Sequence, residues 1–328
     1  MIGGVFMIDT HYDLLSIAYV AYLKNDYSYL EKISKYFNEK NVTGVIANLY
    51  FMSLDEMRDE LHPNYYSEDV SVLEMFKIAK KVLDTYLPDT NILYSIEGAD
   101  YIKDSNELRE LKEAGLDALI MCWNTKSKYA SGNRSNQGLT DEGSKLLETA
   151  IDLGLGIDLS HANKETFNDI INLIGDRDVC VYASHSNSRS LCDRERNLDD
   201  EQLIRLKNIG GLVGVFSNRN FIVDKSVKDT VSEEEKYQKY IEHIDYIASI
   251  VGFDHVMVAT DDMDFCKDAD PEYGETSIYN YENIASKLIS QLDKKYGYEV
   301  AYAISCGNVL DKVFNRIRNK NNNNIRTQ

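Results

Sequence analysis

Residues 155–161 read LGIDLSH and residues 179–197 read VCVYASHSNSRSLCDRERN, and these two stretches decide the fold. Each opens with a short apolar run, and each run leads to a histidine, His161 in the first stretch and His185 in the second. Short apolar runs of this kind are typical of buried parallel strands. Two such strands, with a helical segment between them, predict two imidazoles on the same rim of a sheet. Neutral imidazole is the commonest metal ligand in proteins.

The same alternation continues along the rest of the chain. Six further apolar runs alternate with segments of helical spacing, at residues 5–9, 43–49, 92–96, 117–122, 211–216 and 255–260. Eight runs over about 300 residues predict an α/β fold and favour a (β/α)8 TIM barrel over an open sheet. Thr140 is expected to be the N-cap of the helix that follows it. We expect a single barrel domain over residues 1–316 and a disordered tail over 317–328, where no periodicity is found.

Composition limits the classes of partner. The 328 residues carry 54 acidic and 36 basic side chains, a net charge of −18, which argues against binding to nucleic acid or to an anionic membrane surface. The cysteines, at positions 122, 180, 192, 266 and 306, have no CxxC spacing and are expected to be reduced thiols of a cytoplasmic protein. No signal peptide is expected before residue 9, and no apolar run approaches the roughly 18 residues that span a membrane.

Reactive side chains follow the apolar runs at regular places. Each of the following comes after a run and close to its end: His11 and Asp13 after the first, Glu97 after the third, His161 after the fifth, His185 after the sixth and Asp261 after the eighth. The carboxyl ends of the strands form the face on which barrel active sites are built. Three imidazoles and three carboxylates on one face predict a site for two divalent metals, with zinc favoured and iron or manganese as alternatives. Glu97, by its central position, is predicted to bridge the two ions.

The other three histidines are expected to have simpler roles. His243 lies within a helical pattern and is expected to be exposed, and His255 starts its strand, on the face opposite the site. His62 lies in a polar and aromatic stretch, residues 51–67, which is long for a plain connection; such loops are often functional.

The order and spacing of several motifs resemble one family closely. These motifs are DTHYD at 9–13, IEG at 96–98, GLTDEG at 138–143, GIDLSH at 156–161, ASHSNSR at 183–189, CDRERNL at 192–198, TDD at 260–262 and GNVLDKVF at 307–314. Together they resemble the zinc-dependent membrane (renal) dipeptidases and their soluble bacterial relatives. The resemblance covers nearly the whole chain. It implies a barrel that hydrolyses dipeptides with a water activated by two metal ions, and it implies a homodimer.

The resemblance also implies a role for each site residue. His11 and Asp13 would bind one metal, His161 and His185 the other, and Glu97 would bridge them as a catalytic ligand. The residues with roles toward the substrate would be Arg196, which holds the free C-terminal carboxylate, Asn197 near the same pocket, and Asp261, which handles the proton or the substrate amine.

One departure from the family concerns Trp123. Where the best-known members carry a site histidine after the fourth strand, this chain has tryptophan, so one candidate donor to the tetrahedral intermediate is absent. Trp123 is therefore expected to lie on the side of the site where the substrate binds. It is also the feature that favours the alternative function, that of a homologue that binds metal but has little turnover.

Two further alternatives stay open at this point. Another metal-dependent amidohydrolase would usually carry H-x-H after the first strand and a bridging lysine, whereas this chain has H-x-D and Glu97. A barrel without metal is the third possibility. For Arg196, the alternative to a substrate clamp is a surface salt bridge with Asp193 or Glu195 of its own loop.

Overall fold

Eight parallel strands, in chain order from β1 to β8, form the sheet at the centre of the protein. The computed structural model describes residues 6–50, 70–224, 230–262 and 284–326. The strands are β1 Met7–Tyr12, β2 Val42–Tyr50, β3 Asn91–Glu97, β4 Ala118–Ile120, β5 Gly156–Asp158, β6 Val181–Ala183, β7 Leu212–Phe216 and β8 Val256–Ala259. The eight apolar runs are therefore eight strands, and the predicted TIM barrel is confirmed.

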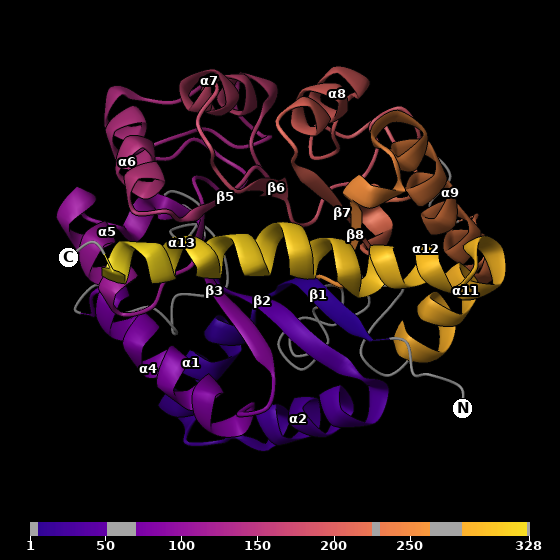
Figure 1. The fold of residues 1–328 in the computed structure, drawn as a ribbon, viewed down its shortest axis with the longest axis horizontal. Helices are drawn as coiled ribbons and strands as arrows, with labels where there is room; N and C mark the ends of the chain where they lie inside the picture. Colours follow the sequence, from indigo (N-terminus) through magenta and orange to yellow (C-terminus); the bar gives the residue numbers. More distant parts are fainter. Residues whose placement is uncertain (1–5, 51–69, 225–229, 263–283, 327–328) are drawn as a thin grey trace.

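Helices connect the strands and surround the barrel (Figure 1). The α-helices are α1 Leu14–Lys24, α2 Ser28–Lys40, α4 Val72–Tyr86, α5 Ser105–Glu113, α6 Asp141–Asp152, α7 Lys164–Ile174, α8 Asp200–Asn208, α9 Glu233–Val251, α11 Ser290–Tyr296, α12 Tyr298–Tyr302 and α13 Asn315–Arg326. Short 3-10 turns are η1 Ala99–Tyr101, η2 Arg219–Phe221 and η3 Phe253–His255, and π-helical segments are η5 Ile284–Ile289, η6 Ala303–Gly307 and η7 Leu310–Phe314. Thr140 caps α6 as predicted, since its side chain accepts a hydrogen bond from the Gly143 amide at 2.9 Å.

The barrel closes between β8 and β1 through side chains. Thr10 Oγ1 donates to the carbonyl of Val258 at 3.0 Å and to that of Ser184 at 2.7 Å, and all of these groups are buried. Asp9 Oδ1 accepts from the Thr260 amide at 2.9 Å, and the Thr260 hydroxyl bonds to the same carboxylate. The first two residues of the DTHYD motif thus hold the two ends of the sheet together, which fixes the position of the next residue, His11.

A separate apolar cluster fills the end of the barrel opposite the site. Ile317 of α13 is fully buried there, together with Phe314 and with Tyr182 of β6. Figure 1 shows α13 crossing in front of the strands. The expectation of a disordered tail from residue 317 is therefore wrong for the start of that segment, because burial of Ile317 ties the helix to the barrel. The extent of the single domain stays a prediction.

Helix α1 was not apparent in the sequence. Its residues, LLSIAYVAYLK, are apolar on nearly every side, and most of them are buried. A helix that is apolar all round shows no polar face and so lacks the periodicity from which a helix is predicted. It begins directly after Asp13, which makes that carboxylate the N-terminal neighbour of the helix.

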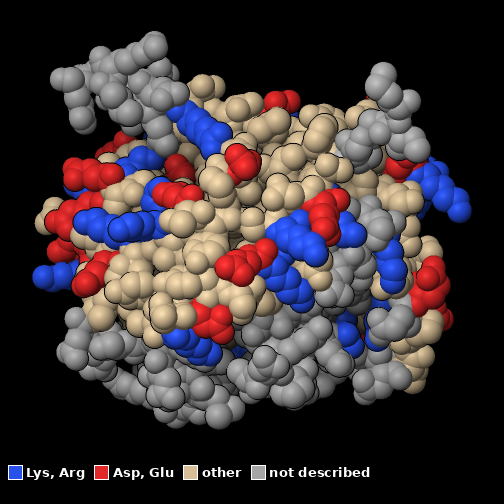
Figure 2. All heavy atoms as spheres, turned by 90° about the horizontal axis from the view of Figure 1, so that it is seen from below, with Lys and Arg blue, Asp and Glu red and all other residues tan. Residues whose placement is uncertain are grey.

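The surface shown in Figure 2 carries basic side chains interspersed with acidic ones rather than one basic field. Clustered Lys and Arg, the electrostatic footprint of nucleic-acid binding, are not seen among the described residues in this view. No helix in the described ranges combines the length and the hydropathy that crossing a bilayer requires.

Candidate metal centre

The predicted ligands come together at the carboxyl ends of the strands. His11 lies near the end of β1, Glu97 is the last residue of β3, and His161 and His185 follow β5 and β6. All four are at most 8% exposed. His161 has a φ of 69°, in the left-handed region, which non-glycine residues enter only when the surroundings hold them there. The strand ends thus converge on a dry site rather than on a solvent-filled surface.

Glu97 lies between two groups of ligands. Its Oε2 is 3.0 Å from His11 Nε2, and its Oε1 is 2.7 Å from His161 Nε2. His185 Nε2 is 3.8 Å from the same Oε1 and 3.0 Å from His161 Nε2. One carboxylate oxygen therefore faces each side, which is the arrangement a bridging carboxylate requires.

The donor atoms form compact sets that could each hold an ion. His11, Asp13 and Glu97 offer atoms within 4.8 Å of one another, and so do Glu97, His161 and His185. Asp13 Oδ1 is buried and has no hydrogen-bond partner in the described chain, and it lies 3.8 Å from His11 Nε2. A buried carboxylate oxygen without a donor is costly unless a cation is nearby. The donors thus fit divalent metal, and imidazole with carboxylate suits zinc.

Asp261 lies at the edge of this group. Its Oδ1 is 4.0 Å from His11 Nε2, and its side chain is 18% exposed, more than those of the other carboxylates in the group. Its φ of 48° is also in the left-handed region. Burial raises the pKa of the Asp261 carboxyl, while His11 lowers it and Glu97 raises it. A carboxyl with a raised pKa at the open edge of a site can accept and return a proton.

Burial and the charges around Glu97 shift the pKa values of the site histidines in opposite directions. Burial lowers the pKa of His11, but Glu97 and the neighbouring aspartates outweigh it and raise the pKa to about 10. Burial and then Arg196 lower the pKa of His161 to about 3. Burial, His11 and Arg196 hold the pKa of His185 well below its usual range. His161 and His185 are therefore neutral near pH 7, the form in which imidazole binds a metal.

Asn124 fixes the orientation of one imidazole. Its Oδ1 lies 2.8 Å from His161 Nδ1. An amide oxygen only accepts, so the ring proton is on Nδ1 and the lone pair of Nε2 points toward Glu97. A hydrogen bond of this kind on the outer nitrogen is usual for histidines that bind metal.

Arg196 is buried beside the site rather than paired on the surface. It is 4% exposed, its Nη1 donates to Ser186 Oγ at 3.1 Å, and its guanidinium lies 5.4 Å from the ring centre of Phe216. Its Nη2 has no hydrogen-bond partner among the described residues. Burial lowers its pKa to about 10, so the group stays charged near pH 7. The alternative salt bridge is not formed, because Asp193 and Glu195 both pair with Arg189.

Asn197 and Trp123 have different surroundings. Asn197 Nδ2 donates to the carbonyls of Cys192 and Phe221, at 2.9 and 3.0 Å, so this amide holds the Arg196 loop in place. Trp123 lies 6.0 Å from His161 between ring centres and 5.3 Å from Tyr50. The indole is thus next to a metal-site imidazole, where it can limit the space for a substrate.

Asp158 was missed in the sequence. It is 1% exposed at the end of β5 and forms a third compact set with His11 and His185. A carboxylate inside an apolar strand run was the signal that could have identified it. His62 and the stretch 51–67 lie outside the described residues.

His243 is buried, so the expectation that it is exposed is wrong. It is 1% exposed, its Nδ1 accepts from the Ser188 amide at 3.1 Å, and its Nε2 donates to the carbonyl of Ile222 at 3.0 Å. The imidazole therefore joins α9 to the loops that follow β6 and β7. These partners come from distant parts of the chain, which helical spacing cannot show.

We expect His243→Gln to reduce the loss of stability in acid. Burial lowers the pKa of His243 to about 4, so its stabilising effect is present above the unfolded-state pKa of 6.5 and is lost as the pH falls toward 4. Between about pH 7 and about pH 5, this one group should lower the free energy of unfolding by about 2 kcal/mol. Glutamine does not titrate, so the variant should not show this loss. Urea unfolding of both proteins at the two pH values measures the difference. Equal losses in both proteins would contradict the assignment.

Comparisons with known proteins match both the sequence and the fold. The sequence model of Membrane dipeptidase (Peptidase family M19) matches residues 65–326. An uncharacterized protein in the pqqA 5′ region of Klebsiella pneumoniae is 33% identical over 175 residues, 51% of this chain and 62% of that protein. An uncharacterized dipeptidase of Schizosaccharomyces pombe is 30% identical over 168 residues, 49% of this chain and 38% of that protein. The aligned part thus spans less than two thirds of either relative.

A solved structure shares the fold over nearly the whole chain. It is a metallo peptidase from Rhodobacter sphaeroides, liganded with a phosphinate mimic of the dipeptide L-Ala-D-Ala. The TM-score is 0.72, with 96% of this chain and 99% of that chain covered, at 18% sequence identity.

Proposed function

This chain belongs to the membrane dipeptidase family, and from that premise we propose that it is a metal-dependent dipeptidase. It hydrolyses the peptide bond of dipeptides that have a free C-terminal carboxylate. The observation that carries the proposal is the position of Glu97, whose two oxygens face His11 on one side and His161 on the other. The neighbour that holds a dipeptide mimic supports a peptide substrate.

We propose two divalent ions, most simply zinc, on the two sides of Glu97. His11 and Asp13 would hold one ion, and His161 and His185 the other. When bound, such ions supply Lewis acidity, which polarises the peptide carbonyl and makes a water more acidic. Glu97 would serve both sides, because its two oxygens lie 3.0 Å from His11 Nε2 and 2.7 Å from His161 Nε2.

The remaining roles fall to residues of this chain. Arg196 would bind the C-terminal carboxylate through Nη2, which has no hydrogen-bond partner among the described residues, and burial of the pair would make that contact strong. Asp261 would take the proton of the attacking water and return it to the leaving amine. Asn197 would keep the Arg196 loop in position. Trp123 would pack against the substrate where other members carry histidine.

We also propose that the protein works as a cytoplasmic homodimer. Cys122, Cys180, Cys192 and Cys306 are free thiols, as is usual in a reducing compartment. The dimer rests on the family resemblance alone, and sedimentation analysis tests it.

Metal analysis with a dipeptide panel tests the proposed function. Purified protein reconstituted with zinc is expected to contain up to two ions per chain, and a chelator should remove hydrolysis of dipeptides reversibly. The panel should include L–D as well as L–L pairs, with each dipeptide compared with its C-terminal amide. Absence of bound transition metal after reconstitution would remove the proposal. Metal binding without hydrolysis of any dipeptide would favour the homologue with little turnover.

A further inference from the structure

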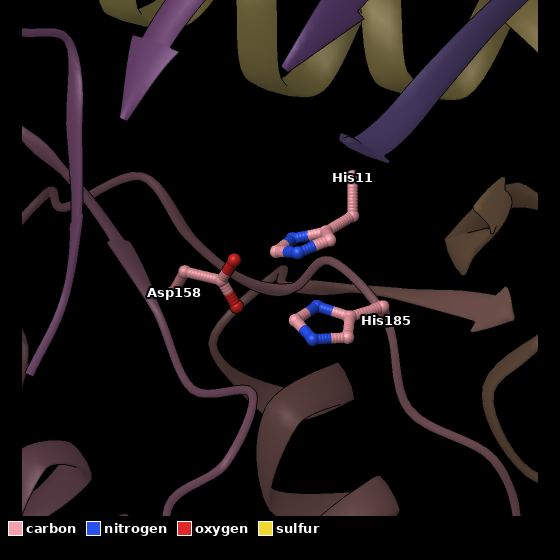
Figure 3. A group of neighbouring side chains, drawn as sticks. All are labelled: His11, Asp158 and His185. Atoms are coloured by element: carbon pink, nitrogen blue, oxygen red, sulfur yellow. The ribbon is translucent and has the colours of Figure 1, made fainter. Parts of the chain in front are cut away.

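A buried carboxylate lies beside two of the metal-site imidazoles. Figure 3 shows the rings of His11 and His185 stacked one above the other, with the Asp158 carboxylate directed toward both. The ring centres are 3.5 Å apart, and the three residues come from β1, β5 and the segment after β6. Asp158 thus lies within the barrel, while Glu97 faces the Nε2 atoms of the same imidazoles.

Backbone amides hold the Asp158 carboxylate in place. Its Oδ1 accepts from the amide of Ser160 at 2.9 Å and from the amide of Ser184 at 3.0 Å. Its Oδ2 is buried and has no hydrogen-bond partner among the described residues. Two of the strand-end segments are therefore tied to one carboxylate, and these are the segments that carry His161 and His185.

The Ser184 hydroxyl lies between the two imidazoles. Ser184 Oγ is 2.7 Å from His185 Nδ1 and 3.3 Å from His11 Nδ1. A hydroxyl has one donor and two acceptor lone pairs. When its proton is directed to Ser160 Oγ, 3.3 Å away, both lone pairs are available to accept the Nδ1 protons of the two rings. A single hydroxyl can thus serve histidines on both sides of Glu97.

His11 Nδ1 has a second neighbour that is compatible with this arrangement. The side-chain amide of Asn48 lies 3.0 Å from it through Nδ2, and Asn48 Oδ1 is buried without a hydrogen-bond partner in the described chain. Asn48 Nδ2 also donates to the Ile46 carbonyl at 3.2 Å. Half a turn of the amide would exchange that bond for one between Oδ1 and the ring, so that Asn48 and Ser184 could share the Nδ1 proton of His11.

We propose that Ser184, supported by Asp158, is a positioning residue shared by both halves of the metal centre. By accepting the Nδ1 protons of His185 and His11, it leaves both Nε2 lone pairs facing Glu97. This inference rests on the proposed function, since it assumes that the two imidazoles bind metal. It predicts that loss of the Ser184 hydroxyl weakens the binding of both ions, whereas loss of the Asn124 amide weakens only the binding of the ion at His161.

A third ion among His11, Asp158 and His185 is the competing explanation of the same cluster. An ion there would use the Nδ1 atoms, while the Nε2 atoms face Glu97. Each ring would then have to lose its one N–H proton and bind as an imidazolate, whereas a neutral imidazole keeps that proton. The hydroxyl between the rings makes the support role the simpler one.

The test compares zinc binding by Ser184→Ala, Asp158→Asn and a control, Ser217→Ala. Ser217 is also a fully buried serine at a strand end, but its hydroxyl donates to the Thr260 carbonyl at 2.8 Å. Competition with a chromophoric chelator should show zinc affinity reduced about 10- to 100-fold in Ser184→Ala, at both sites, and unchanged in the control. Asp158→Asn keeps an oxygen for the two amides, so it should fold and should change zinc affinity much less than Ser184→Ala does. Circular dichroism of the metal-free proteins checks folding.

Cobalt substitution gives a readout independent of activity. The visible absorption of bound Co²⁺ depends on ligand geometry, so Ser184→Ala should change the spectrum of both ions and Ser217→Ala should not. If Ser184→Ala bound zinc and cobalt as the control does, Ser184 would not position the ligands, although the proposed function would stand. If the unmodified protein bound no zinc, both proposals would be lost. A third ion in the unmodified protein that Asp158→Asn lacks would establish the competing explanation.

Discussion

Glu97→Gln is expected to lower kcat for dipeptides by about 100-fold or more and to remove at least one ion. The carboxylate is 2% exposed, and its two oxygens lie 3.0 Å from His11 Nε2 and 2.7 Å from His161 Nε2. Glutamine keeps the shape but has one oxygen and no charge. Its NH₂ group would have to face one of the two imidazoles or the ion bound there. One side of the centre therefore loses a ligand, and the buried site loses a negative charge that offsets the cations.

Metal analysis and steady-state kinetics on the same preparation measure both effects. Glu110→Gln, on the exposed face of α5, is the control for the chemical change and should keep full metal content. Glu97→Asp keeps the charge but is shorter. Its kcat and metal content should lie between those of Glu97→Gln and Glu110→Gln. Near-normal kcat with full metal content in Glu97→Gln would show that another group connects the two sides.

Arg196→Met should reduce kcat/KM for dipeptides by roughly 30- to several-thousand-fold. Removing one partner of a buried charged pair costs about 2–5 kcal/mol, and about 1.4 kcal/mol corresponds to one factor of ten. The guanidinium is buried, and its Nη2 has no partner in the described chain. A buried cation with an unused donor is suited to an anionic ligand. The metal content should not change, because Arg196 is not among the clustered ligands.

A second substrate and a second arginine make this test specific. A dipeptide amide has no carboxylate to hold, so it should be a poor substrate of the unmodified enzyme and lose little more in Arg196→Met. Arg189→Met is the matched control in the same loop, because Arg189 pairs with Asp193 and Glu195 at the surface. It should change kcat/KM by less than about 3-fold, as expected for exposed ion pairs. Equal losses of kcat/KM for the dipeptide and for its amide would show that Arg196 has a structural role.

The sequence alone determined the barrel and the places of its reactive groups. The strands are short buried runs separated by helical segments, so their number follows from local pattern. The parallel order of the barrel then puts every carboxyl end on one face. His11, Glu97, His161 and His185 could therefore be assigned to one site without coordinates. Thr140 was likewise predictable, because an N-cap is a property of a few adjacent residues.

Residues whose roles depend on distant partners could not be assigned in this way. Asp9 and Thr10 belong to the first strand, but their partners are in β6 and β8 or just after these strands. His243 was expected to be exposed on its helix, yet its ring is buried and joins two loops. Helix α1 escaped prediction because it is buried on nearly every side.

Arg189 and Arg196 illustrate why the sequence alone could not assign such roles. Both lie in one loop with Asp193 and Glu195, and sequence spacing allows either arginine to pair with them. The fold directs Arg189 to these carboxylates and places Arg196 inside, against Phe216 and Ser186. Local pattern determines which residues lie at a strand end. The packing of distant segments decides which of them are buried. It also decides which buried polar atoms are left without a partner and can bind a ligand.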